Sequence, residues 1–164
     1  MFSLSIIVGL VFGVFCCIFQ FFPLSNLGVL WMAFASAALY FNGGGDPKNF
    51  PNYACSFIIG CAWGLLYVWG VGFLVKAGLN VPLTLLVDVG VITAIVCLVH
   101  FILLAKTWLN HAPSIFMAIA FTFSLGGKDL VAEIVTVVCG FVLAIICLEG
   151  NKLFTKLSNK SAAE

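Results

Sequence analysis

The segment WMAFASAALYFNGGGDPK, residues 31–48, decides the fold of this chain, because an apolar run of helix length ends there in a glycine-rich break. A second apolar run follows and carries Gly60 and Gly64. The arrangement returns later, where GGKD at residues 126–129 interrupts an apolar run, and the next run carries Gly140 and Ala144. Since glycine ends helices by adopting positive φ, each copy predicts a helix–turn–helix unit, and its repetition predicts two related halves.

The composition places the chain in a membrane. It is 63% hydrophobic and 8% charged, and a soluble domain of 164 residues could not bury that much apolar surface. A spanning helix needs about 20 apolar residues, so the chain has room for about six spans. We predict an all-α integral membrane protein with one transmembrane domain over residues 1–150 and a polar cytoplasmic tail over 151–164. The predicted spans run from about Leu4 to Phe22, Leu24 to Phe41, Tyr53 to Val75, Pro82 to Ala105, Ala112 to Leu125, and Leu130 to Leu148.

The two halves are predicted to be repeats, one over about residues 4–76 and the other over about 82–150. MAFA at residues 32–35 is echoed by MAIA at 117–120, and the pair Gly9 and Gly13 is echoed by Gly90 and Ala94. Three spans per half is an odd number, so the second half enters the membrane from the opposite side. The six transmembrane helices then form two inverted three-helix repeats. Small residues four apart let helices approach closely, so the glycine pairs at 9 and 13 and at 60 and 64 are predicted at helix contacts.

The positions of the cationic residues predict the orientation of the chain in the membrane, and their type limits the classes of partner that it could bind. All seven cationic residues are lysines. A cytoplasmic N-terminus puts five of them inside and two outside, as the positive-inside rule favours, so both termini are predicted to be cytoplasmic. The absence of arginine argues against nucleic acid as a partner. The expected partners are the lipid bilayer, a small-molecule solute and further copies of the chain, in a homo-oligomer formed through the small-residue faces.

Three ionisable residues lie inside predicted spans. Asp88 is about two turns into the fourth span and Glu133 about one turn into the sixth, both toward the outer side. Charges in spans are costly and face a cavity or a partner. Either these carboxylates form a mouth or binding site, with or without proton coupling, or they lie near the headgroups and pair with Lys76 or Lys128. His100 is either a hydrogen-bonded structural group or a proton carrier.

The glycine breaks and the aromatic residues beside them are further pathway candidates. The two breaks are predicted on opposite membrane faces, where they are either ordinary turns or parts of a pathway through the repeats. Phenylalanines beside them either gate by dewetting or face lipid and the helix bundle. These candidates are Asn42, Gly43, Gly44, Gly126, Gly127, Phe41 and Phe123.

No pattern of catalytic or metal-binding residues is present in the sequence. The seven cysteines lie in apolar runs without zinc-ligand spacing, and there is no HExxH motif, no Ser/His/Asp set and no phosphate-cradling loop. We therefore predict no catalytic residue, no metal, no cofactor and no enzymatic activity.

The repeated segments carry a family resemblance. Residues 31–64, with Tyr40-Phe41 before the glycine break, and residues 113–140, with the GGKD break, resemble the small bacterial inner-membrane proteins grouped as domain of unknown function 1097. The resemblance implies a location in the bacterial inner membrane. It supplies no substrate and no site residue.

The sequence leaves three functions open. The scarcity of charge within the spans favours a channel or facilitator for a small neutral or weakly polar solute. The ionisable residues Asp88, Glu133 and His100 would serve a proton-coupled transporter. A non-transporting scaffold or regulatory subunit is the third.

Overall fold

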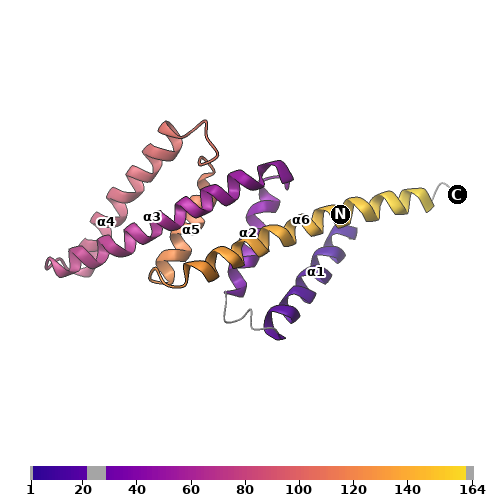
Figure 1. Ribbon diagram of the computed structural model, residues 1–164, viewed down its shortest axis with the longest axis horizontal. Helices are drawn as coiled ribbons and strands as arrows, with labels where there is room; N and C mark the ends of the chain where they lie inside the picture. Colours follow the sequence, from indigo (N-terminus) through magenta and orange to yellow (C-terminus); the bar gives the residue numbers. More distant parts are fainter. Residues whose placement is uncertain (1, 22–28, 162–164) are drawn as a thin grey trace. The chain divides into compact units, whose positions relative to one another are not determined.

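The computed structural model describes residues 2–21 and 29–161, which form six α-helices (Figure 1). The prediction of an all-α protein is confirmed. A 3₁₀ turn, η2 (Pro47–Asn49), precedes the third helix, and a π-helical segment, η3 (Leu98–Leu103), continues the fourth. The helices are α1 (Phe2–Phe21), α2 (Leu30–Asn42), α3 (Phe50–Lys76), α4 (Val81–Cys97), α5 (Ala112–Ser124) and α6 (Leu130–Ser161).

Three stretches of the described chain are long and apolar enough to cross a membrane: Pro47–Lys76, Val81–Leu103 and Leu130–Asn159. By contrast, α2 and α5 have 13 residues each. At 1.5 Å per residue they are about 20 Å long, against a hydrocarbon core of about 30 Å. The membrane character of the protein is therefore clear, while the crossing of the bilayer by all six helices stays a prediction.

The ends of two helices differ from the predicted bounds. The predicted end of the first span at Phe22 and the predicted start of the second at Leu24 lie outside the described residues; within them, Val29 is extended, with φ −117° and ψ 107°, and α2 begins at Leu30. A β-branched residue fits extended backbone well. At the other end, α6 continues through the predicted polar tail to Ser161. An ion pair of 2.7 Å between Lys152 and Glu149, one turn apart, supports that extension.

The chain divides into two compact units. Unit 1 (residues 1–47 and 131–164) contains α1, α2 and α6, and unit 2 (residues 48–130) contains α3, α4 and α5. Each unit therefore combines two helices of one predicted half with the third helix of the other half.

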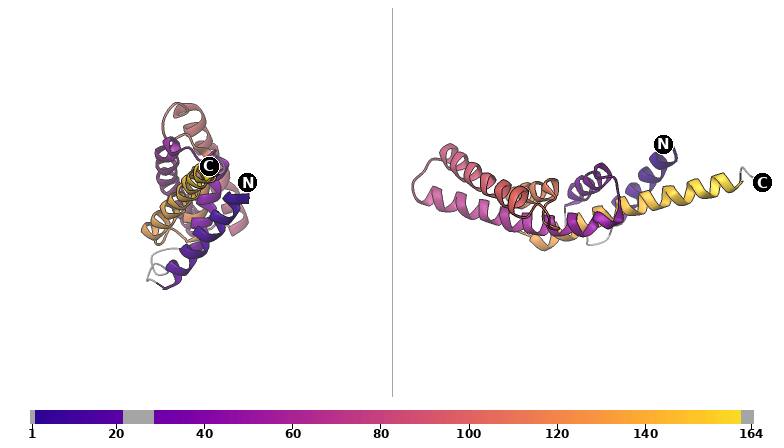
Figure 2. Two further views of the ribbon diagram at one scale, coloured as in Figure 1. Left: turned by 90° about the vertical axis from the view of Figure 1, so that its right-hand side faces the viewer. Right: turned by 90° about the horizontal axis from the view of Figure 1, so that it is seen from above.

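In unit 2, α3 is the long central helix, with α4 antiparallel to it and α5 parallel to it. The hydroxyls of Tyr67 and Thr93 share a hydrogen bond of 2.7 Å between α3 and α4, and the right-hand view of Figure 2 shows α4 running back along α3. At the start of α3, the side chain of Asn52 donates to that of Asn110, at 3.0 Å, just before α5.

The contact of α5 with α3 is close because α3 presents glycine. A Cβ atom added to Gly60 would lie 2.6 Å from the carbonyl oxygen of Ile115 and 2.6 Å from Cβ of Ala118. One added to Gly64 would lie 2.5 Å from Cβ of Thr122. No larger residue fits at either position, so the predicted close contact of this glycine pair is confirmed.

Unit 1 is built on a similar plan around α6. A Cβ atom added to Gly140 would collide with the carbonyl oxygen of Ala33 and with Oγ of Ser36, both in α2. The α1 helix runs antiparallel to α6, since Ile7, near its start, lies 3.6 Å from a Cβ atom added to Gly150, late in α6.

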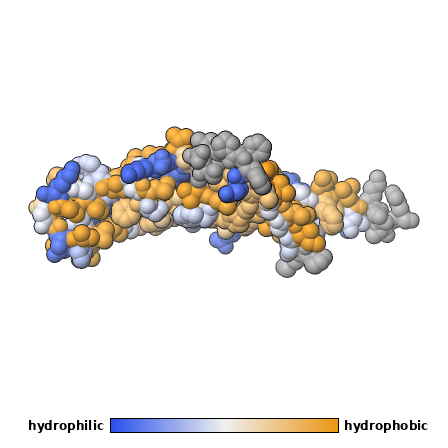
Figure 3. All heavy atoms as spheres, turned by 90° about the horizontal axis from the view of Figure 1, so that it is seen from below, coloured by the Kyte–Doolittle hydropathy of each residue, from blue (hydrophilic) through white to orange (hydrophobic). Residues whose placement is uncertain are grey.

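The predicted close contact of Gly9 and Gly13 is wrong within the described part of the chain. No atom described there lies within 4 Å of a Cβ atom added to either of these residues, or to Gly90. A small-xxx-small pattern makes close approach sterically possible, but it does not determine which helix face meets a partner. Hydrophobic residues cover most of the face shown in Figure 3, as expected for a membrane protein.

Candidate functional site

Asp88 lies on the face of α4 that packs against α3. Thr84, Asp88, Ile92 and Val96 recur at every fourth residue and are all buried, so they form one stripe on the helix. Asp88 is only 5% exposed and Thr84 is fully buried. An ionisable residue therefore occupies a helix–helix contact inside unit 2.

Glycine on α3 makes room for the carboxylate. A Cβ atom added to Gly70 would collide with Oδ1 of Asp88, so the carboxylate lies directly against the backbone of α3. Gly70 is six residues before Lys76, the last residue of α3. That distance is about 9 Å along a helix, so the carboxylate lies well inside the helix pair.

Two oxygen atoms on this stripe lack hydrogen bonds. Neither Oδ2 of Asp88 nor Oγ1 of Thr84 has a partner among the described residues. The alternative in which Asp88 pairs with Lys76 or Lys128 is not found there either. Burying a carboxylate without a partner is costly, so these two oxygens mark the position where a partner from outside the chain would be stabilising.

A groove of about 250 Å³ opens between α3 and α4 at this position. Asp88 is the charged residue in its lining, and Trp69 and Phe73 provide aromatic rings that stack 5.5 Å apart with their planes 15° from parallel. The lining residues are Leu66, Trp69, Gly70, Phe73, Leu74, Val87, Asp88, Val91 and Ile92.

Glu133, the second predicted carboxylate, is not brought together with Asp88 in either unit. It lies in the first turn of α6, in unit 1, and is 1% exposed. The partial positive charge at a helix N-terminus favours a carboxylate at that position. Asp88 belongs to unit 2.

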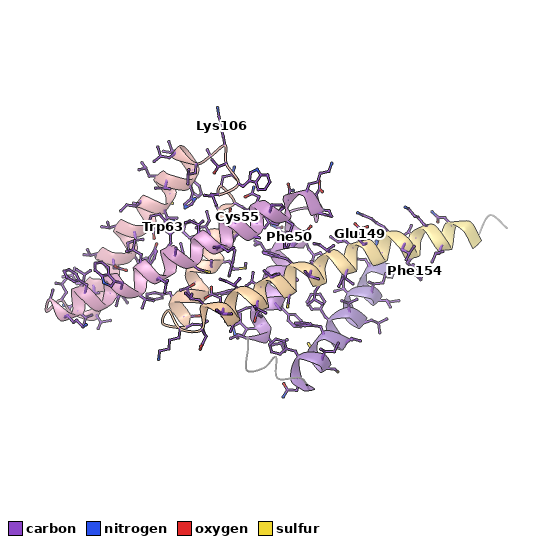
Figure 4. All side chains as sticks on the ribbon, viewed as in Figure 1. Phe50, Cys55, Trp63, Lys106, Glu149 and Phe154 are labelled. Carbon is purple, nitrogen blue, oxygen red and sulfur yellow. The ribbon has the colours of Figure 1, made fainter. Side chains whose placement is uncertain are left out.

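Both ring nitrogens of His100 are engaged in hydrogen bonds. Nε2 accepts from Nε1 of Trp63 at 2.9 Å, and Nδ1 then donates to the carbonyl oxygen of Leu109 at 2.5 Å. Figure 4 labels Trp63 on α3, on the side of α4. His100 is 1% exposed and lies in η3. The geometry favours the structural alternative for this residue, since neither nitrogen is available for relaying a proton without breaking a bond.

His111, which sequence reasoning did not select, caps the N-terminus of α5. Its Nδ1 accepts hydrogen bonds from the backbone N–H of Ser114, at 3.3 Å, and from the hydroxyl of Ser114, at 2.8 Å. The ring packs against Tyr53 with centroids 4.0 Å apart. Burial lowers the pKa of His111 below its usual range. Ser, Thr, Asp and Asn dominate at N-caps, so the residue type gave no signal for this role.

The glycine breaks are helix caps. The N–H of Gly45 donates to the carbonyl of Tyr40 and that of Gly44 to Phe41, and Gly44 has φ +85°. The second break repeats these bonds from Gly127 to Thr122 and from Gly126 to Phe123. This is the Schellman arrangement, in which glycine takes the left-handed conformation. It explains Gly44 and Gly126 as caps, and Asn42 and Gly43 as the last helical and capping positions.

The candidate phenylalanines each line a groove of their own unit. Phe41 lines one of about 580 Å³ in unit 1, together with residues of α1 and α6. Phe123 lines one of about 240 Å³ in unit 2, where its ring also contacts that of Tyr67 with centroids 6.3 Å apart. No group of three metal-ligating side chains occurs in the described residues.

A comparison with family models identifies the family of the chain. The model described as "Protein of unknown function (DUF1097)" matches residues 5–151. The chain therefore belongs to this family, as the resemblance in residues 31–64 and 113–140 implied. Neither the curated proteins nor the solved structures gave a match.

Proposed function

We propose that this member of the DUF1097 family is a multi-pass inner-membrane protein that carries a small neutral or weakly polar solute across the bilayer as a channel or facilitator. The observation that carries the proposal is Asp88, a buried residue whose carboxylate Oδ2 has no partner among the described residues and which lines a groove between two apolar helices. A scaffold held together by apolar contacts has no use for such a group, whereas a solute path does.

Internal duplication supports a transporter architecture. Gly140 follows Gly60 by 80 residues, and each glycine meets the short helix of its unit in the same way. Gly60 faces the Ile115 carbonyl and the Ala118 side chain, and Gly140 faces the equivalent atoms of Ala33 and Ser36, which lie 82 residues earlier.

Two further sets of contacts repeat. The capping bonds of Gly44 and Gly45 recur 82 residues later. In unit 2, Gly70 faces Asp88, and in unit 1, Gly150 faces Ile7. The two glycines are 80 residues apart, and the two residues that they face are 81 residues apart. The MAFA and MAIA segments lie 85 residues apart, which is three residues more than the 82 that separate the equivalent contacts. Residues three apart lie on the same face of a helix, so the two segments resemble each other although they are not at equivalent positions.

The duplication also supports the proposed topology. With three helices per half, a chain that crosses with every helix inserts its halves in opposite orientations, as two inverted repeats. The lysine distribution then puts both termini in the cytoplasm. Since Gly60 and Gly64 are used within unit 2, the proposed homo-oligomer needs another surface, and the open faces of Gly9 and Gly13 are available within the described chain.

A proton-coupled transporter is the second candidate, and Asp88 favours it specifically. A carboxylate that is alternately protonated and ionised would couple proton movement to the solute. On α3 the titratable neighbour is Tyr67, whose hydroxyl is held by Thr93, and on α4 the neighbouring polar group is Thr84.

Solute flux into liposomes tests both candidates. Purified protein would be reconstituted and screened with a panel of small solutes, with and without a proton gradient. Asp88→Asn keeps the shape and hydrogen-bonding capacity of the side chain but cannot ionise. We expect it to fold and to lose flux, or to lose the dependence of flux on pH between about pH 5 and about pH 8.

The matched control is Asp129→Asn, in the exposed second glycine break, where φ is +56° and asparagine is well tolerated. Flux per folded molecule that is unchanged in Asp88→Asn at every pH would exclude proton coupling through Asp88 and leave a passive channel. No flux of any solute would favour the scaffold.

A further inference from the structure

We propose that the groove between α3 and α4 binds a small amine in its ammonium form, with the nitrogen paired with the carboxylate of Asp88 and the alkyl part against Trp69 and Phe73. This inference rests on the proposed function and narrows its solute to a weak base, which is uncharged as the free amine and is held as the cation.

Asp88 defines the polar end of the site, because it is the charged residue in the lining of the groove. The residue is only 5% exposed, and its Oδ2 has no hydrogen-bond partner among the described residues. Thr84, one turn earlier on α4, is fully buried and lies outside the lining. A primary ammonium has three N–H donors and forms short, charge-assisted hydrogen bonds with a carboxylate.

Charge decides between an ammonium and other ligands that donate hydrogen bonds. A neutral alcohol or amide would leave the carboxylate charge uncompensated in apolar surroundings, while an ammonium cancels it. An anion would be repelled. Ca²⁺ and Mg²⁺ take six or more oxygen ligands and Zn²⁺ takes about four ligands, whereas Asp88 is the side chain in this lining that offers oxygens.

The aromatic lining completes the match. Trp69 and Phe73 line the same groove as Asp88, and the faces of aromatic rings attract cations. The lining also includes Leu66, Val87 and Val91, whose aliphatic side chains suit a short alkyl chain. A groove of about 250 Å³ accommodates an amine of a few carbon atoms.

Binding to the purified full-length protein in lipid nanodiscs tests the inference without any variant. The probes are n-butylammonium, the neutral n-butanol, and tetramethylammonium, which has charge but no N–H donor. Calorimetry should show butylammonium binding at least about tenfold more tightly than butanol, and also more tightly than tetramethylammonium. Equal affinity for butylammonium and butanol would overturn the proposal, as would displacement of butylammonium by sodium at equal concentration.

Variants then locate the site. Asp88→Asn should weaken butylammonium binding by at least about tenfold. Gly70→Ala keeps the carboxylate but pushes it from its position, so it should weaken binding as well. Gly72→Ala is the matched control, because no packing neighbour among the described residues lies within 4 Å of the added methyl group. Unchanged affinity in Asp88→Asn, or equal effects of the two glycine substitutions, would contradict the assignment.

Failure of this inference is distinguishable from failure of the proposed function. If neutral solutes cross liposomes but butylammonium does not bind, the amine site is wrong and the transport function stands. If butylammonium binds through Asp88 but no solute of the panel crosses, the site stands and the transport function is wrong.

Discussion

Units 1 and 2 have the same internal plan but differ in the chemistry of one contact. In unit 2 the antiparallel helix α4 places Asp88 against Gly70, and in unit 1 the antiparallel helix α1 places Ile7 against Gly150. In unit 2 the groove between these helices is lined by both Gly70 and Asp88. In unit 1 a groove farther along α1 and α6 is lined by aliphatic and aromatic residues, without Ile7 or Gly150.

This difference shows whether the packing of the antiparallel helix on the long helix requires a carboxylate. In unit 1 an antiparallel helix packs on the long helix with an aliphatic residue at the corresponding position, at the ordinary van der Waals distance of 3.6 Å from a Cβ atom added to Gly150. A carboxylate is therefore not required for such a pair of helices to pack, and its burial costs free energy. Its presence in unit 2 is best explained by a ligand or a proton.

The shared part of the plan gives the largest expected effect. Gly60→Leu and Gly140→Leu should each lower the free energy of unfolding by about 3 kcal/mol or prevent folding, because the side chain has no room between the long and the short helix of its unit. Unfolding by heat or denaturant of the purified protein measures the loss. Gly72→Leu, on the open face of α3, is the control and should be tolerated. A large loss in one unit and none in the other would show that the two contacts are not equivalent.

Short-range patterns in the sequence predicted much of this plan. Glycine spacing predicted the close contact at Gly60 and Gly64, and glycine-rich breaks predicted the caps at Gly44 and Gly126. In both cases the information is local, because glycine is required by steric limits at the residue itself.

The sequence could not predict which elements meet. The pattern of Gly9 and Gly13 resembles that of Gly60 and Gly64, yet within the described chain only the second pair meets a helix. The order of the spans did not reveal either that α3, of the first predicted half, packs with α4 and α5 of the second. The position of Asp88 inside a predicted span was enough to select it as a site residue. Whether its carboxylate has a partner could not be predicted, because that depends on which residues of α3 face it.

Exchanging the differing residues tests whether Asp88 serves function rather than folding. Asp88→Ile gives unit 2 the residue type of unit 1 and should raise the free energy of unfolding by about 1–3 kcal/mol, since a buried charge is replaced by an apolar group. Ile7→Asp should lower it by about 3 kcal/mol. Denaturant unfolding measures both, and flux should be lost in Asp88→Ile despite the gain in stability. A loss of stability in Asp88→Ile as large as that in Ile7→Asp would make the carboxylate structural.

The starts of the short helices differ as well, and they give the smallest expected effect. His111 caps α5 through its ring, while Val29, 82 residues earlier, precedes α2 without a side-chain cap. Because burial holds the pKa of His111 below its usual range, the neutral ring is the form that the fold favours. Its contribution is complete above about pH 6.5 and is lost as the pH falls through the lowered pKa. Protonation removes the acceptor and adds a positive charge at a helix N-terminus.

His111→Asn keeps a capping oxygen that does not titrate, so the melting temperature of this variant should fall less than that of the wild type between about pH 7 and about pH 5. His111→Val copies the start of α2 and should cost about 1 kcal/mol at neutral pH. Asp88 and Glu133 are present in all three proteins, so their titration cancels in the differences between melting curves. Parallel pH dependence in the wild type and in His111→Asn would show that the ring does not act as a titrating cap. In that case, the two short helices would begin in equivalent ways despite their different residues.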